Sequence, residues 1–503
     1  MLKLLTAQQT READQYTINH EPVSSIDLME RAAAAFTEVF KNNYPGREKN
    51  IAVYCGTGNN GGDGLAIARL LYDAGYQHIA VSIMRFSKRS SADFDINFDR
   101  LSQLDIPVRE VENADTSDAE NSDIIIDALL GTGLSKPLAG EWTKLIEQLN
   151  FLNKTVVSVD VPAGFKTEGE LAANIVLKSD LVITFQRPKL NFLLPESERY
   201  MEKFSVVNIG LDEDFIQSAA SPYFLLTETA VSSRIRRRQP FSHKGTYGHV
   251  LVAAGNDNTM GAALLASGAS LFTGSGLTTA CIPSSGLAAL NSRYPEVMAV
   301  PRDKVKPADM EWGKYTTAAV GPGLGTFADG KRILETVLKE ISRPVVIDAD
   351  AINLISYHYE LMQLVPEHSV FTPHVKEFDR LFGEHKSWWD RLETGIDRAR
   401  TLGCTIVLKN RYTIIFTPKG ECVFNPTGNP AMAGGGMGDV LTGMIASFIA
   451  QGYTPHDAAM VGVYVHGSTG DKLAGEKKLA VITASELLEN IPAAAAELSK
   501  SIN

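Results

Sequence analysis

Residues 428–443 read Gly-Asn-Pro-Ala-Met-Ala-Gly-Gly-Gly-Met-Gly-Asp-Val-Leu-Thr-Gly, a glycine run that ends in Asp439. The apolar segment 440–450 that follows predicts a buried helix, and the glycines before it allow the backbone to approach a ligand closely. Backbone N–H groups at a helix N-terminus form an anion site. The stretch therefore predicts an anion site with one carboxylate in the first turn of a helix.

Asp439 has two interpretations. A carboxylate at this position is often only a cap that the helix dipole favours. It is also the position of a base beside a phosphoryl group in transfer. The short pattern leaves both interpretations open, and the remainder of the chain favours the base.

The stretch resembles the signature loop of the ribokinase-like superfamily. Asn429-Pro430 before the glycines and residues 440–443 after Asp439 look most like the ADP/ATP-dependent NAD(P)H-hydrate dehydratases. The resemblance implies that the loop amides bind the donor phosphate and that Asp439 takes the proton of the acceptor hydroxyl.

The same resemblance implies two further sets of residues. Hydrated nicotinamide nucleotide would contact Ala263, Gly323, His374 and Asp439, and ADP with magnesium would contact Lys409, Asn410, Arg411, Tyr412, Thr413 and Gly438. Three residues depart from the family pattern: Lys376 replaces a usual glycine, and Asn410 and Met437 replace small residues. Lys376 puts the local backbone conformation in question.

Composition limits the class of protein. A chain of 503 residues is too long for one ordinary hydrophobic core, so two or three domains are expected. A net charge of −11 disfavours nucleic-acid and anionic-membrane partners. The four cysteines form no CxxC pair, which argues against a zinc site or disulfide framework and fits a reducing cytoplasm.

Neither a secretory signal nor a membrane span is predicted. The first residues turn polar before an apolar core forms. Residues 260–282 are uncharged, but their serines and glycines favour a buried helix followed by a strand.

The first half alternates strand-like and helical patterns. Helices are predicted at 7–20, 25–43 and 65–74, and strands at 51–55, 78–84, 123–129, 155–159, 180–184 and 204–209. This alternation predicts a mainly parallel sheet with helices on both faces. Polar loops at 59–64, 127–137 and 160–164 follow three of the strands, and they are expected at the same edge of the sheet, where such folds bind ligands. Turn formers and helix caps are the ordinary alternative for each loop taken alone.

These loops resemble the YjeF N-terminal domain, the NAD(P)H-hydrate epimerase, across roughly residues 1–215. The resemblance implies that the hydrated nucleotide contacts Asn59, Asn60, Gly61, Gly62, Asp63, Gly131, Thr132, Gly133, Leu134, Ser135, Lys136, Pro137, Trp142 and Asp160. Asp160 is the candidate for acid/base work, and Asn60, Asp127 and Ala163 would hold potassium. Ala163 stands where serine is common, so its contact would be through the carbonyl. Lys136 replaces an arginine and offers a point charge in place of a bidentate fork.

Periodicity is lost near residues 215–225, which predicts two domains, 1–218 and 223–503. In the second half, strand-like runs lead into loops near residues 255, 321, 348, 372 and 409, and a hairpin is predicted at 412–424. One parallel sheet with its site along one edge explains these loops together. The expected fold is thus two three-layer αβα domains, the first Rossmann-like and the second ribokinase-like.

By resemblance, the chain is expected to epimerise hydrated NADH and NADPH and to dehydrate the S form with ADP. A ribokinase-like kinase for a hydroxymethylpyrimidine or a sugar, with a non-catalytic nucleotide-binding domain, is the alternative. No residue decides between ADP and ATP. A homo-oligomer is the default expectation.

Overall fold

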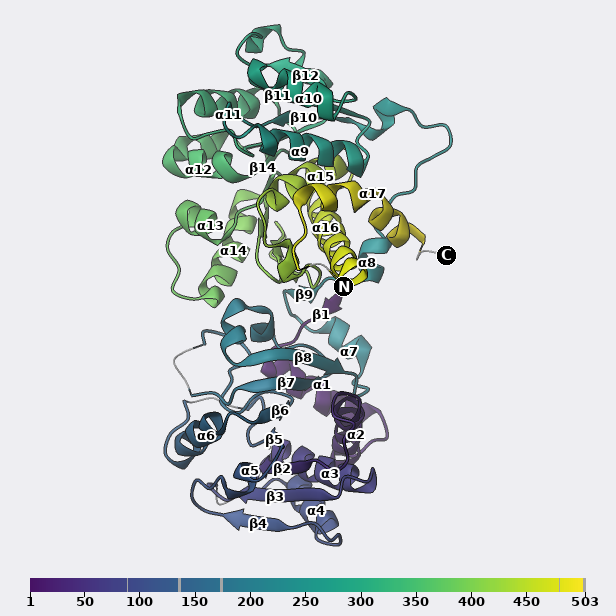
Figure 1. Ribbon diagram of the computed structural model, residues 1–503, viewed down its shortest axis with the longest axis vertical. Coiled ribbons are helices and arrows are strands. Elements are labelled where there is room, and N and C mark those ends of the chain that lie inside the picture. Colours follow the sequence, from purple (N-terminus) through teal and green to yellow (C-terminus); the bar gives the residue numbers. More distant parts are fainter. Residues whose placement is uncertain (88, 134–136, 172–174, 479, 501–503) are drawn as a thin grey trace. The chain divides into compact units, whose positions relative to one another are not determined.

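The computed structural model describes residues 1–87, 89–133, 137–171, 175–478 and 480–500. This part of the chain divides into two compact units (Figure 1). Lys3–Ser221 with Ser387–Trp389 forms the first unit, and Met1–Leu2 with the rest of the chain from Pro222 onward forms the second. Each unit is built on one α/β sheet, so the predicted fold class is confirmed.

The first unit contains a seven-stranded sheet in the order β4-β3-β2-β5-β6-β7-β8. Every strand pair is parallel, where a mainly parallel sheet was predicted. The strands are β2 (Asn50–Cys55), β3 (His78–Met84), β4 (Val108–Val111), β5 (Ile124–Ala128), β6 (Thr155–Val159), β7 (Ser179–Phe185) and β8 (Met201–Val207). The order reverses between β2 and β5, and such switch points are where doubly wound sheets bind ligands.

Helices cover both faces of this sheet. The helices are α1 (Ala7–His20), α2 (Ser25–Asn43), α3 (Asn59–Asp73), α4 (Ala92–Leu101), α5 (Ser117–Glu120), α6 (Glu141–Leu152) and α7 (Glu213–Ser218). Phe36 of α2 and Leu65 of α3 are buried in the core on one face, and Leu145 and Ile146 of α6 are buried on the other. Ser24 caps α2 by accepting the N–H of Asp27, at the predicted position.

The sequence prediction for residues 59–64 was wrong in one respect, because this segment is helical. The helix α3 begins at Asn59 rather than at Leu65. Its glycines are needed for space: a Cβ on Gly61 would lie 1.8 Å from the Gly56 carbonyl oxygen, and one on Gly64 would lie 2.4 Å from the Ala128 Cβ. The first turns of α3 therefore press directly onto the carboxyl ends of β2 and β5.

The second unit contains an eleven-stranded sheet in the order β1-β9-β18-β17-β16-β15-β14-β13-β10-β11-β12. The strands are β1 (Leu2–Lys3), β9 (Tyr223–Leu225), β10 (His249–Ala253), β11 (Leu277–Ile282), β12 (Met298–Pro301), β13 (Thr317–Val320), β14 (Val346–Ile347), β15 (Val370–Phe371), β16 (Thr405–Leu408), β17 (Ile414–Phe416) and β18 (Cys422–Phe424). The strands β10 to β16 pair in parallel, and β17 and β18 form the predicted hairpin. The sheet is therefore mixed rather than wholly parallel, with the chain's first residues at one edge.

Helices also lie on both faces of the second sheet (Figure 1). The helices are α8 (Glu228–Ser232), α9 (Met260–Thr273), α10 (Leu287–Arg293), α11 (Ala328–Glu340), α12 (Ala349–Tyr357), α13 (Val375–Phe382), α14 (Trp388–Leu402), α15 (Met437–Ala450), α16 (Pro455–Lys477) and α17 (Ala484–Lys500). On one face, α9, α15, α16 and α17 share a core with the sheet. The uncharged segment 260–282 is the helix and strand that were predicted, α9 and β11.

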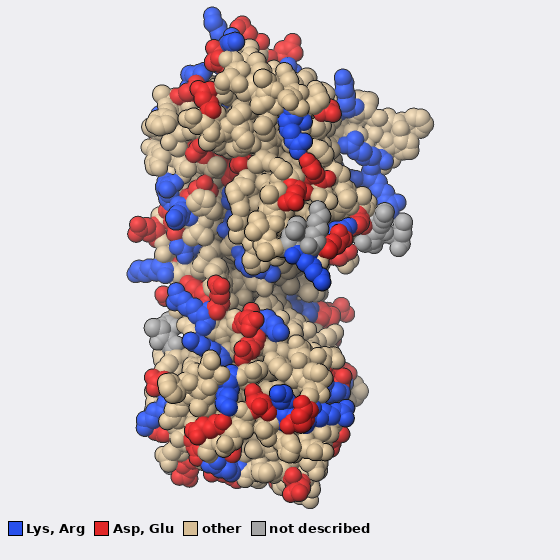
Figure 2. Space-filling model, viewed as in Figure 1, with Lys and Arg blue, Asp and Glu red and all other residues tan. Residues whose placement is uncertain are grey.

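Three properties of the described residues bear on the predicted class. Among the helices of the described residues, none is long and apolar enough to cross a membrane. On the face shown in Figure 2, basic and acidic side chains are interspersed over each unit. All four cysteines are buried as free thiols.

Candidate functional sites

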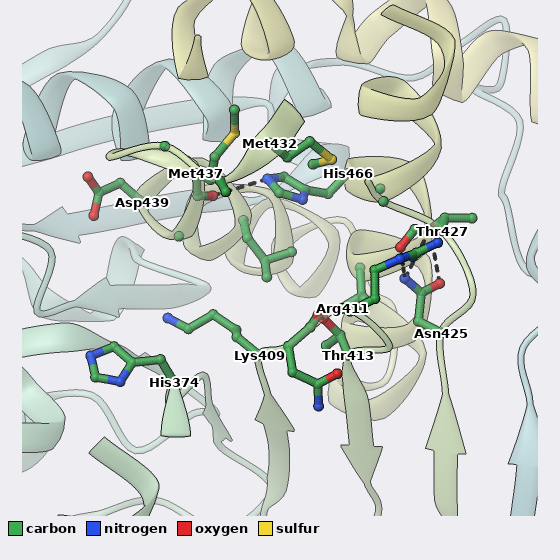
Figure 3. A pocket seen from close by; sticks show the side chains of 18 of the residues that line it. His374, Lys409, Arg411, Thr413, Asn425, Thr427, Met432, Met437, Asp439 and His466 are labelled. Carbon is green, nitrogen blue, oxygen red and sulfur yellow. Dashed lines mark hydrogen bonds between the residues drawn. The ribbon is translucent and has the colours of Figure 1, made fainter. Parts of the chain in front are cut away.

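A cavity of about 830 Å³ in the second unit lies where β14, β15 and β16 end and α15 begins (Figure 3). Its size falls in the range of roughly 300–1,000 Å³ that is usual for small-molecule sites. Residues that line it include Asp348, His374, Glu377, Lys409, Asn410, Arg411, Thr413, Asn425, Thr427, Gly434, Gly435, Gly438, Asp439 and His466. The signature loop and the three strand ends thus meet at one place, as the topology predicts.

The N-terminus of α15 supplies unused backbone donors to this cavity. Gly436 precedes the helix with a left-handed φ of 91°, and no side chain caps this end. The first N–H groups of a helix have no intrahelical acceptor and attract anions. Gly435, Met437 and Gly438 line the cavity beside Asp439, so this end of the helix is suited to a phosphate group.

Asp439 lies in the first turn of α15. Burial, together with the nearby carboxylates Asp348 and Asp350, raises its pKa to about 7, although Lys409 opposes the shift. A general base works best when its pKa lies near the working pH. A pKa in this range suits a general base, whereas a simple helix cap needs no such shift.

Lys409 is held beside Asp439 by a buried carboxylate. Its Nζ lies 2.8 Å from Asp348 Oδ1, and Asp348 is only 1% exposed. Thr442 donates to the other oxygen, Asp348 Oδ2, at 2.7 Å. In Figure 3 the Lys409 side chain extends into the space between Asp439 and His374. A fixed positive charge thus faces the region where an anionic donor would lie.

His374 lines the cavity and has a second, structural role. It caps α13, because its Nδ1 accepts the N–H groups of Lys376 and Glu377. Its Nε2 therefore carries the proton and lies 3.3 Å from Glu377 Oε1. Lys376 lies in the first turn of α13, and its φ is not in the left-handed region. Lys376 stands where glycine is usual, but its backbone conformation here is that of an ordinary helix.

Three other predicted residues of the second unit lie outside the lining of this cavity. Ala263 is fully buried in α9, and Gly323 forms a turn with φ +57° whose carbonyl accepts bonds from Asn256 and Thr259. Neither residue lines the 830 Å³ cavity. Tyr412 is also outside the lining, and Arg411 lies over its ring at 4.8 Å.

Sequence reasoning missed His466 of α16. Its Nε2 lies 3.1 Å from the Met437 carbonyl oxygen, so Nε2–H is the donor. Burial lowers the pKa of His466 to about 4, so the ring is neutral near pH 7. This bond ties α16 to the first residue of α15, 29 positions earlier. No local spacing could have signalled a contact that tertiary packing creates.

In the first unit, Asn60 in the first turn of α3 and Asp127 near the end of β5 both lie at the switch point of the sheet. Asn60 Nδ2 donates to the Val159 carbonyl at 3.1 Å, and its Oδ1 is buried without a partner among the described residues. Asp127 Oδ2 accepts the Ser158 hydroxyl and the Ala163 N–H, and burial raises the pKa of Asp127 to about 6. A buried oxygen without a partner and a buried carboxyl at the same switch point are groups that a monovalent cation could satisfy.

Ala163 fits this cation site less completely. Its N–H bonds to Asp127, and its carbonyl already accepts the Leu177 N–H at 2.9 Å. The fit to potassium therefore rests on Asn60 and Asp127, with one lone pair of the Ala163 carbonyl remaining.

The other predicted residues surround the same end of the sheet. A Cβ on Gly131 would lie 3.2 Å from Asn60 Nδ2, so the loop after β5 passes closely over Asn60. Asn59 and Asp63 line a groove of about 340 Å³. Trp142 packs edge-on against Phe86 at 4.7 Å. The predicted contacts Leu134, Ser135 and Lys136 lie outside the described residues.

Asp160 follows β6 with a left-handed φ of 64°. A non-glycine residue in this conformation is strained, and such strain is often found at functional sites. Its Oδ1 accepts bonds from Thr184 and the Phe185 N–H, and Lys189 Nζ lies 2.8 Å away. Lys189 is a second residue that the sequence did not indicate.

Together, the parallel strand order, the uncapped glycine loop and the near-neutral carboxyl beside Lys409, which pairs with buried Asp348, are the features of a ribokinase-like unit with an anion site, joined to a second α/β unit. The family described as NAD(P)H-hydrate dehydratase matches residues 250–493, and the YjeF-related protein N-terminus matches residues 25–191.

Relatives cover nearly the whole chain. The bifunctional NAD(P)H-hydrate repair enzyme of Moorella thermoacetica is 31% identical over 97% of this chain and 96% of its own length. The Escherichia coli enzyme of the same name is 30% identical over 92% and 88%. A ribokinase-like superfamily protein from Enterococcus faecalis covers 56% of this chain and 97% of its own, with 32% identity and a TM-score of 0.51. The chain belongs to the family of bifunctional NAD(P)H-hydrate repair enzymes.

Proposed function

We propose that the chain repairs hydrated NADH and NADPH in two steps. The first unit interconverts the R and S epimers, and the second dehydrates the S form with ADP to give NAD(P)H, AMP and phosphate. The observation that carries the second step is the near-neutral carboxyl of Asp439 at the uncapped start of α15. The first step is supported by a separate polar site at the switch point of the first sheet.

In the dehydration, Asp439 takes the proton of the hydroxyl on the hydrated ring carbon. The oxygen then attacks the terminal phosphorus of ADP, and AMP leaves. The ring nitrogen expels the new phosphate group, and loss of a proton from the adjacent carbon restores the dihydronicotinamide. Phosphorylation thus makes a poor leaving group into a good one, so a kinase site performs a dehydration.

The remaining site residues of the second unit bind and orient ADP and the hydrated nucleotide. By the family resemblance, ADP is assigned to Lys409, Asn410, Arg411, Tyr412, Thr413 and Gly438, and the hydrated nucleotide to Ala263, Gly323, His374 and Asp439. Of these residues, Tyr412, Ala263 and Gly323 lie outside the lining of the 830 Å³ cavity. Lys409, fixed by Asp348, balances charge on the donor phosphates. Among the described residues, no three His, Cys, Asp or Glu side chains form a metal cluster, so magnesium would be held chiefly by the phosphates of ADP and by water.

In the first unit, the hydrated nucleotide is assigned to residues 59–63, 131–137, Trp142 and Asp160. Asp160 is the acid/base residue. Potassium is assigned to Asn60, Asp127 and the Ala163 carbonyl, where it would neutralise the buried carboxyl and hold the loops after β5 and β6 together. The proposed partners are small molecules. The chain is proposed to act as a homo-oligomer in the cytoplasm.

The direct test mixes the protein with both epimers of NADH hydrate, magnesium, potassium and either ADP or ATP. NADH absorbance and chromatography of the epimers and nucleotides are followed together. Complete conversion of both epimers with AMP formed from ADP is expected. Conversion of the S form alone would reject the epimerase assignment. A stable phosphorylated product from a hydroxymethylpyrimidine or sugar, with no conversion of hydrate, would favour the small-molecule kinase.

A further inference from the structure

The carboxylate of Asp160 is anchored through one oxygen only. Thr184 Oγ1 and the Phe185 N–H each donate to Oδ1 at 3.0 Å, and Lys189 Nζ forms an ion pair with the same oxygen at 2.8 Å. None of the described hydrogen bonds reaches Oδ2. An oxygen that accepts three donors has no room for a proton of its own. The free oxygen is thus where Asp160 would exchange a proton with a ligand.

Lys189 is itself fixed in place. Its side chain is only 6% exposed, and Nζ also donates to the Phe185 carbonyl at 3.3 Å. It is a residue of the segment between β7 and the short helix Leu190–Leu193. The ammonium group is therefore built into the backbone turn that also donates to Asp160, and it is not a mobile surface charge.

Two further carboxyl groups line a groove that Phe185 also lines, and the Phe185 N–H donates to Asp160. Asp14 of α1 and Asp63 of α3 line the 340 Å³ groove with Asn59. Burial, with the charge of Asp160, raises the pKa of Asp14 to about 6, while Lys189 and the exposed Arg11 lower it. Burial and the neighbouring carboxylates Asp160, Asp14 and Asp93 raise the pKa of Asp63 well above its usual value.

These carboxyl groups have unequal access to positive charge. Lys189 contacts Asp160 directly, whereas no described ion pair reaches Asp63. Carboxyl groups that crowd together do not all ionise, and the one without a cation keeps its proton. The arrangement therefore separates a carboxylate bonded to the Phe185 N–H from a carboxylic acid in the groove that Phe185 lines.

We propose that Lys189 is the positioning residue of the first unit's acid–base centre: it holds Asp160 as a carboxylate with one free oxygen, and Asp63 carries the proton that the reaction needs. This inference rests on the proposed epimerase function.

Inversion at the hydroxyl-bearing ring carbon requires both forms. In ring opening, the base takes the hydroxyl proton as the C–N bond breaks and C=O forms, and the acid protonates the ring nitrogen. Closure on the opposite face reverses both transfers. In loss of water, the acid protonates the leaving hydroxyl as the C–O bond breaks, and the base takes a proton from the water that returns. Each route moves one proton to the substrate and one from it, which suits a carboxylic acid paired with a carboxylate.

The test compares epimer exchange in the wild type, Lys189→Met and Lys189→Arg across pH, with purified hydrate and no ADP. Lys189→Met should lower kcat by roughly 100-fold and change KM little, because general acid–base catalysis supplies about that factor. The shape of its pH profile should also change, because the ammonium group that pairs with Asp160 is gone. Lys189→Arg keeps the charge and should restore much of the rate.

Arg187→Met is the matched control. Arg187 is a buried cation two residues earlier, and it pairs with Glu213 rather than with Asp160. Its removal should leave the shape of the pH profile unchanged. ADP-dependent conversion of the S epimer by the second unit checks that each variant is intact outside the first unit.

Asp63→Asn provides an independent arm that does not remove a buried charge pair. It should lower kcat about 100-fold and abolish the basic limb of the profile, which a residue that only binds substrate would not do. A rise in KM alone for Asp63→Asn, a fall of less than threefold in kcat for Lys189→Met, or an equal change in the pH profile of Arg187→Met would each overturn the inference. A wild type that exchanges no epimers would reject the proposed epimerase and this inference with it, whereas an active wild type beside an unaffected Lys189→Met rejects the inference alone.

Discussion

Lys409 Nζ lies 2.8 Å from Asp348 Oδ1, and this carboxylate, 1% exposed, is joined through its second oxygen to Thr442 of α15. The pair links the end of β16 to the end of β14 and to α15. A buried pair of this kind contributes less as attraction than it costs when one partner is removed, because the remaining charge then has no counter-ion.

Lys409→Met should therefore destabilise the second unit by about 3–5 kcal/mol. Thermal and urea unfolding measure this change. The double variant Lys409→Met/Asp348→Asn should recover most of the stability but not the ADP-dependent activity. Lys339→Met removes a surface lysine that pairs with Glu335, and it should cost at most about 1 kcal/mol. Equal costs for the two lysines would contradict the buried-pair argument.

Asp439→Asn should reduce hydrate-dependent AMP formation by roughly a thousandfold or more, because the variant keeps the shape of the side chain and loses the base. Epimer exchange in the first unit should continue at the wild-type rate. Asp309→Asn, which changes an exposed aspartate of the same unit, serves as the control. Loss of both activities in a folded Asp439→Asn protein would exclude two independent sites.

The pH dependence of dehydration should report Asp439. Because its pKa is raised to about 7, kcat should rise as pH increases through 7 and level off above it. This rise in kcat with pH should disappear in Asp439→Asn, because the variant has no carboxyl group to titrate at this position. A wild-type profile that is flat from pH 5 to pH 8 would argue against Asp439 as the base.

Stability should change with pH in the opposite sense. A carboxyl whose folded pKa is raised binds its proton more tightly in the folded state, so the fold loses stability as pH rises from about 4 to about 7. Asp439→Asn removes this penalty and should unfold at a higher temperature than the wild type at pH 8. At pH 4 the two proteins should differ little. Calorimetry at the two pH values makes the comparison.

Gly436→Ala should damage the anion site. Its φ of 91° is strained for alanine, and the new Cβ would lie 2.5 Å from Leu265 Cδ1. Activity with ADP should fall sharply, with a stability loss of about 1–2 kcal/mol. Gly475→Ala, in an exposed part of α16 with no atom within 4 Å of the new Cβ, should leave activity intact and slightly favour the helix.

Potassium should activate epimer exchange, and lithium should not replace it. Asn60→Leu removes the orphaned oxygen and should abolish the response to potassium. Asn150→Leu, which removes an amide bonded to backbone elsewhere in the first unit, should keep the response. The measurement is the exchange rate during titration with each chloride salt at constant ionic strength.

The two α/β layouts were predictable because their signals are local. Strands such as β3 and β6 have the predicted bounds, and glycine loops mark several strand ends. The position of Asp439 in the first turn of a buried helix was predictable for the same reason, since the glycines and the apolar helix are contiguous in sequence. The start of α3 was not, because glycines at 61, 62 and 64 weaken a helix in isolation and only contact with the sheet explains them.

Residues that act through long-range contacts gave no such signal. His466 meets Met437 across a helix pair, Thr442 meets Asp348 across 94 positions, and Lys189 meets Asp160 through a turn. His466 and Lys189 belong to no motif that the sequence indicated, and although Thr442 lies in the stretch 440–443, nothing in that stretch indicates its bond to Asp348. Their roles follow only from which side chains remain near each carboxyl group after folding.

The sheet of the second unit has the dipeptide Leu2–Lys3 as its outermost strand, next to β9. A gene fragment that begins at Pro222 would therefore encode a protein whose β9 has lost its neighbour, and a bare strand of this kind invites pairing with other chains. A truncated protein that contains only the second unit is thus expected to aggregate. Inactivation of one centre by substitution within the intact polypeptide is the cleaner genetic separation.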